Sequence, residues 1–152
     1  MKRLLLSVAA VLLAVPAFAA TKVAETRDDG DQEARFAQVC VENLLPQTMI
    51  VTSEWGVGDF AQVTRVQQYT SVLYRLQTND ADYSPNLSVG YRTAGTLGTA
   101  RGSLVPTWSD EPLTECNETV TTYTFAFITG DDGQTYTTLV AKPVDPDGND
   151  SN

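Results

Sequence analysis

Apolar and polar residues alternate along most of this chain. From residue 36 onward apolar side chains recur at every second position and not at the 3.6-residue spacing of a helix, and Val, Thr, Tyr and Phe are the enriched types. This pattern predicts strands at 36–43, 48–55, 60–67, 70–77, 86–93, 100–105, 119–129 and 134–142. No segment has the pattern of a long amphipathic helix, so the predicted fold class is all-β.

The last two predicted strands form the clearest local pattern. Tyr123, Phe125 and Phe127 share one face of the 119–129 strand, and the sequence Gly-Asp-Asp-Gly at 130–133 supplies a tight reversal into the final strand. These segments are predicted to form a β-hairpin.

One face of each predicted strand is expected to contact solvent. In the 70–77 strand, Leu73, Arg75 and Gln77 alternate with a more apolar set, which predicts that these three residues lie on the solvent face. Half-buried strands of this kind close a core only by packing two sheets together or by curling one sheet into a barrel. We predict an antiparallel two-sheet β-sandwich of about seven or eight strands, immunoglobulin-like in general shape, with a small β-barrel as the alternative.

The first 19 residues have the features of a cleaved secretory signal peptide. Lys2 and Arg3 precede an uncharged apolar run at 4–15, and Pro16 comes before the A-x-A pattern at 17–19. The run is shorter than the roughly 20 residues that cross a bilayer. The sequence therefore predicts export to the periplasm or the extracellular space, in a manner typical of Gram-negative bacteria, and no stable membrane span after cleavage.

The chain is acidic, with 10 Lys and Arg against 19 Asp and Glu, a net charge of −9 and a pI of about 4.3. Removal of Lys2 and Arg3 with the signal would leave eight basic residues and a net charge of −11. This balance argues against a nucleic-acid partner, whose phosphates would repel the protein. Residues 20–35 are expected to be an acidic flexible leader and 144–152 an acidic disordered tail, with the β-sandwich domain at 36–143.

Cys40 and Cys116 are the two cysteines of the chain. In an oxidising compartment they are expected to form an intramolecular disulfide. The bond would close a loop of 77 residues, worth roughly 4 kcal/mol in the chain-entropy model. A free thiol pair or a bridge between two subunits is the alternative.

Catalytic and metal-binding patterns are missing from the sequence. Without histidine there is no His-based triad or His metal site, and neither Lys22 nor Lys142 lies in an S-x-x-K arrangement. The acidic segment 145–150 lacks the terminal glutamate of a calcium loop. We therefore expect no enzymatic activity, no bound metal and no cofactor.

Two loops that carry aromatic and acidic residues are the predicted binding sites. Exposed tryptophans stack on sugars or anchor protein partners. The alternative is that both tryptophans belong to the core, one plugging the end of the sandwich and the other covering the disulfide. The candidate binding residues are Trp55, Asp59, Phe60, Trp108, Asp110 and Glu111.

These features predict a small exported binding or interaction protein whose partner is an unidentified protein or glycan. The alternative is a structural or assembly subunit of the cell envelope whose strand edges pair with neighbours. An exported β-sandwich of this length with one disulfide resembles fimbrial pilins in general shape only. Pilins have closer cysteines and a tyrosine near the end of the chain, whereas Tyr136 here is followed by a charged tail.

Overall fold

The computed structural model describes residues 22–27, 34–56, 61–80, 82–96 and 98–142. The predicted signal peptide at 1–19, the tail at 144–152 and the candidate residues Asp59 and Phe60 lie outside this part of the chain. The described residues form ten β-strands in two sheets and no helix, which confirms the all-β prediction. Accordingly, none of the described segments is a helix with the length and apolarity to cross a membrane.

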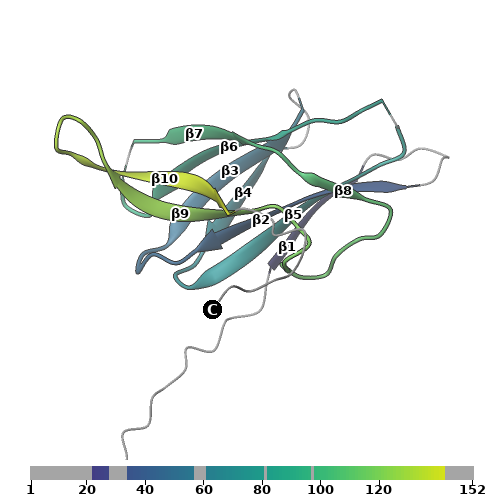
Figure 1. The fold of residues 1–152 in the computed structure, drawn as a ribbon, viewed down its shortest axis with the longest axis horizontal. Coiled ribbons are helices and arrows are strands. Elements are labelled where there is room, and N and C mark those ends of the chain that lie inside the picture. Colours follow the sequence, from purple (N-terminus) through teal and green to yellow (C-terminus); the bar gives the residue numbers. More distant parts are fainter. Residues whose placement is uncertain (1–21, 28–33, 57–60, 81, 97, 143–152) are drawn as a thin grey trace, which may run out of the picture.

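The strands are arranged as two stacked sheets (Figure 1). Sheet A has the order β1 (Lys22–Arg27), β5 (Thr70–Thr78), β2 (Arg35–Asn43), β9 (Thr122–Thr129) and β10 (Thr135–Lys142), and the short β8 (Thr107–Ser109) also pairs with β2. Sheet B has the order β4 (Gln62–Val66), β3 (Met49–Trp55), β6 (Leu87–Thr93) and β7 (Ala100–Leu104). The two sheets establish the sandwich and not the barrel.

Two pairings in sheet A are parallel, which the prediction of a fully antiparallel sandwich did not include. β1 runs parallel to β5, and β9 runs parallel to β2. The ten strands also exceed the seven or eight predicted, because β1 and β8 were not recognised as strands. Each of the two additional strands pairs with a strand that the sequence predicted, β1 with β5 and β8 with β2.

The prediction of a flexible leader at 20–35 is wrong for residues 22–27. This segment pairs with β5 over the register Lys22↔Val72 to Arg27↔Gln77. Ala24 is buried in the core between the sheets, and Val23 packs against a second cluster on the opposite face of sheet A. The strand forms because its two small apolar residues fit the two faces, and because β5 would otherwise be left with an unpaired edge.

The main core lies between the two sheets. β2, β3, β5 and β6 contribute alternate residues to it, as the period-two pattern predicted. Tyr91 of β6 and Phe125 of β9 meet edge to face across this core, with ring centroids 5.4 Å apart. The largest fully buried side chains of this core include Tyr74, Phe125, Met49, Leu76 and Leu87.

The second face of β5 is covered, contrary to the prediction that it contacts solvent. Leu73 is fully buried with Cys40 and Val120, and Leu113 and Cys116 pack against them. The segment that follows β8 therefore crosses the outer face of sheet A as an additional layer. Alternation along β5 correctly separated its two faces but did not show that a distant segment covers the second one.

The buried hydroxyl of Tyr74 is expected to make the protein less stable at alkaline pH. Its hydroxyl is buried without a hydrogen-bond partner among the described residues. Burial raises its pKa to about 12. The nearby Thr64 side chain offsets part of this rise, although its distance and angle to the Tyr74 hydroxyl do not make a hydrogen bond. Because the unfolded chain releases this proton near pH 10, stability should fall as pH rises from about 10 to about 12, by roughly 2–3 kcal/mol in all.

Urea titrations of the wild type and of Tyr74→Phe between pH 8 and pH 11.5 measure this contribution. The variant is expected to lose less stability at high pH than the wild type. Tyr69→Phe changes an exposed ring and serves as the matched control, with a profile like that of the wild type. Parallel profiles for the wild type and Tyr74→Phe would contradict the assignment.

Candidate functional site

The predicted binding residues that the structure describes lie at one end of the sandwich. Trp55 pairs with Leu87, and Leu87 pairs with Leu104, so the end of β3 lies beside the chain that leads into β8. Trp55 is only 3% exposed and belongs to the core. Its prediction as a binding residue is wrong, because the apolar pattern of β3 continues to its last residue and the ring fills the space between the sheets.

Trp108 is half-buried at the same end. It lies opposite Ala37 in the β2–β8 pairing, and its ring packs against the main core. The Arg35 guanidinium carbon lies 4.9 Å from the centroid of its ring, within the range of a cation–π contact. The indole is therefore held by the core and by Arg35, which leaves little of its face for a ligand.

Asp110 and Glu111 follow β8 and are both exposed. Trp108, Asp110 and Glu111 are close neighbours in the sequence and lie on one short segment in and just after β8. The sequence predicts no strand between 100–105 and 119–129, and β8 corrects this, because Phe36–Gln38 of β2 pair with it.

The segment after β8 is fixed to sheet A by a buried glutamine. The Gln38 amide nitrogen donates to Ser109 Oγ at 2.7 Å and to the Glu111 carbonyl at 3.1 Å, and its oxygen accepts from Leu113 N at 2.6 Å. Arg75 Nη1 donates to the Leu113 carbonyl at 2.7 Å. Buried side chains that bond to loop backbone fix the loop's course, so the exposed acids sit on a rigid support.

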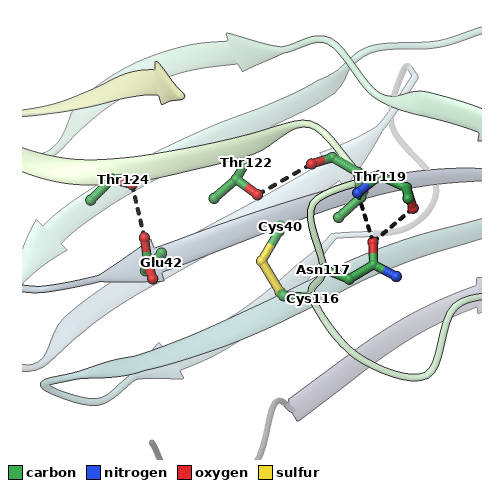
Figure 2. The surroundings of a disulfide bond; sticks show 8 residues. Cys40, Glu42, Cys116, Asn117, Thr119, Thr122 and Thr124 are labelled. Atoms are coloured by element: carbon green, nitrogen blue, oxygen red, sulfur yellow. Dashed lines mark hydrogen bonds between the residues drawn. A yellow bond between two sulfur atoms is a disulfide. The ribbon is translucent and has the colours of Figure 1, made fainter. Parts of the chain in front are cut away.

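The Cys40–Cys116 disulfide completes this attachment, as the sequence predicted (Figure 2). It joins β2 to the crossing segment, with the two Cα atoms 5.7 Å apart. Directly after it, Asn117 Oδ1 accepts from Thr119 N and Thr119 Oγ1, which turns the chain back toward β9. The disulfide and these hydrogen bonds therefore hold the crossing segment against sheet A.

The β9–β10 hairpin presents a different kind of surface. Its exposed large apolar residues are Phe127 (50%), Ile128 (47%), Tyr136 (48%) and Val140 (48%). Figure 1 shows the turn of this hairpin at the opposite end of the molecule from β8. The register places Tyr136 opposite Ile128, with Val140 four positions further along β10 on the same face.

The hairpin is exposed because its strands continue past their neighbour. The β2–β9 pairing covers only Cys40↔Thr122 to Glu42↔Thr124. Beyond it, Phe127 and Ile128 belong to a part of β9 whose described strand partner is β10 alone. A two-stranded ribbon is marginally stable in water by itself. Sequence alternation placed Phe127 with Phe125 on one face, but it did not show that the core ends between them.

The turn of the hairpin is well ordered. Gly130 N donates to the Gln134 carbonyl at 2.8 Å, and Gly133 adopts a φ of +73°, a conformation that favours glycine. The Asp132 carboxylate accepts from Gln134 N and from the Tyr136 hydroxyl. The hydrogen bond from Tyr136 is the main cause that lowers the pKa of Asp132, and the same bond raises the pKa of Tyr136. Tyr136 is therefore oriented along the ribbon.

The described residues contain no group of three or more His, Cys, Asp or Glu side chains placed to hold a metal ion. The chain as a whole has no histidine.

Comparison with known proteins gives no match. No protein-family model matches the chain, and neither a curated protein nor a solved structure is significantly similar to it.

Proposed function

We propose that this protein is an exported, non-catalytic interaction protein that contacts a partner protein through its β9–β10 hairpin. The observation that carries the proposal is the clustering of exposed apolar side chains. Of the eight exposed large hydrophobic residues in the described chain, Phe127, Ile128, Tyr136 and Val140 lie on this one ribbon. Ile128, Tyr136 and Val140 share one face of the ribbon, and Phe127 lies on the other. Exposed apolar patches on such a face mark interaction sites.

Export is supported by two features of the sequence and structure. The pattern of residues 1–19 is that of a signal peptide. The Cys40–Cys116 disulfide is of the kind that persists in oxidising compartments outside the cytoplasm. The periplasm and the extracellular medium both fit these features.

A protein partner fits the hairpin better than a glycan does. Aliphatic side chains beside an open strand edge suit the addition of another strand. Sugar recognition through tryptophan requires an accessible ring face. The Trp108 ring is packed against the core and covered by Arg35, so the loop that the sequence favoured offers less contact than the hairpin.

A photo-reactive amino acid placed at Ile128 tests the proposal in the native host. Adducts are expected from this position, because it is half-exposed in the apolar patch. The same group at Thr52, an exposed residue of β3, is the matched control and should give none. The group at Asp110 reports on the Trp108 loop.

Adducts from Asp110 in place of Ile128 would contradict the hairpin assignment and favour the loop. As a second readout, Ile128→Asp should abolish the adducts formed from a reactive group at Tyr136. Its thermal midpoint should stay close to that of the wild type, because residue 128 is half-exposed.

A further inference from the structure

The outer edge of β10 has no strand paired with it in the described chain. Gly130 N donates to the Gln134 carbonyl, so in this antiparallel ladder the even-numbered residues of β10 direct their backbone groups at β9. The odd-numbered residues, Thr135 to Ala141, therefore direct theirs away from it. Within the described chain β10 is the last strand of sheet A, so no strand is hydrogen-bonded to these groups, although β7 of sheet B approaches part of β10.

This edge lacks the charges that protect the edges of sheet B. Proteins block pairing at exposed strands with charged residues, proline or bulges. At the edges of sheet B, β4 carries the exposed Arg65 and β7 carries the exposed Arg101. β10 has no charged residue before Lys142, its last position, and no proline.

The geometry points to a second copy of this chain as the strand that pairs with β10, antiparallel and with the twofold axis at Thr138. The proposal rests on the hairpin being the interaction surface and names its partner. In this register Tyr136 faces Val140 of the second copy, and Thr138 faces its own counterpart. An aromatic residue opposite a β-branched residue, and a threonine opposite a threonine, are favourable cross-strand pairs. Both pairs fall at non-hydrogen-bonded positions, where side chains on the two strands approach most closely.

Charge complementarity supports the same register. The hairpin carries its acids, Asp131 and Asp132, at the turn and its one cation, Lys142, at the opposite end. Antiparallel self-pairing about Thr138 places Lys142 opposite Gln134 of the second copy, next to that copy's turn acids. Neither β9 nor β10 carries an acidic residue, so pairing of two β10 strands brings no carboxylates of these strands together in an otherwise acidic protein.

Light scattering of the purified chain over increasing concentration is the first test. The mass is expected to rise from that of one chain to that of two. Thr137→Pro should hold the protein at the mass of one chain, because the Thr137 N–H points at the free edge and its loss breaks no bond to β9. Thr137→Ala is the matched control and should dimerise like the wild type.

If Thr137→Pro fails to fold, Val140→Lys takes its place, since Val140 is half-exposed and is proposed to face Tyr136 of the second copy. One-chain mass for the wild type at every concentration would overturn the proposal, as would a Thr137→Pro protein that is folded and dimeric.

Cysteine cross-linking tests the register. Thr138→Cys is expected to form a covalent dimer under mild oxidation, because position 138 lies on the proposed axis. Thr137→Cys should not, since residue 137 faces residue 139 of the second copy. Cross-linking at 137 and not at 138 would overturn the proposed register.

The experiments distinguish the proposal that the partner is a second copy of the chain from the proposal that the hairpin is the interaction surface. Adducts from Ile128 that contain a different protein, with a wild type that stays at one-chain mass, would overturn the second-copy assignment and leave the hairpin as the interaction surface. Adducts that join two copies of the chain support both. No adduct together with one-chain mass would overturn both.

Discussion

Replacing Phe125 with alanine is expected to lower the free energy of unfolding by about 3–5 kcal/mol. Phe125 is 1% exposed, and its ring contacts Tyr91 of the opposite sheet edge to face. Truncation removes the transfer free energy of a buried aromatic ring and leaves a cavity between two sheets that cannot fully collapse around it. Urea denaturation followed by tryptophan fluorescence measures the loss.

Phe127→Ala is the matched control on the same strand. Phe127 lies two positions further along β9, on the same face, but is 50% exposed. Its truncation should change stability by no more than about 1 kcal/mol. Equal losses for the two variants would show that the core extends along the hairpin, which would contradict the exposure of the part of β9 that continues past β2. The pair therefore locates the point where the core ends.

Removal of the disulfide by Cys40→Ala with Cys116→Ala is expected to cost about 2–5 kcal/mol. The bond joins residues 76 positions apart, so its loss frees a long loop in the unfolded chain. It also leaves the segment over sheet A attached mainly through Gln38 and Arg75. The stability of the oxidised wild type, the reduced wild type and the double variant measures the effect.

The reduced wild type and the double variant should have similar midpoints, and reductant should not change the double variant further. Amide exchange is expected to increase first at Leu113 and its neighbours, where the crossing segment depends on the bond. If the oxidised wild type and the double variant had equal stability, the loop-closure account of this disulfide would be contradicted.

The predicted site differs from the structure for a reason visible in its residues. Trp55 and Trp108 were chosen because they end or follow strands, where large residues can be exposed. Large residues at strand ends also fill the space between the two sheets at the end of a sandwich. Here Trp55 is buried, and the Arg35 guanidinium lies over the ring of Trp108. The apolar residues that are exposed, such as Phe127 and Tyr136, lie in strands whose sequence looks like any half-buried strand.

The sequence by itself determined the all-β class, eight of the strands to within a few residues, the final hairpin and the cysteine pair. These features depend on local periodicity, on turn residues such as those at 130–133, and on there being only two cysteines. Each of these features can be read from residues close together in the sequence or from the residue count, without knowledge of which segments pack against each other.

Only the tertiary structure decided what covers each face. Leu73 is buried because a segment some 40 residues away crosses it, held by Gln38 and the disulfide. Phe127 is exposed because β2 ends before it, although it shares its face with buried Phe125. Burial depends on where neighbouring segments begin and end, which is a property of the assembled sheets and not of the alternation within one strand.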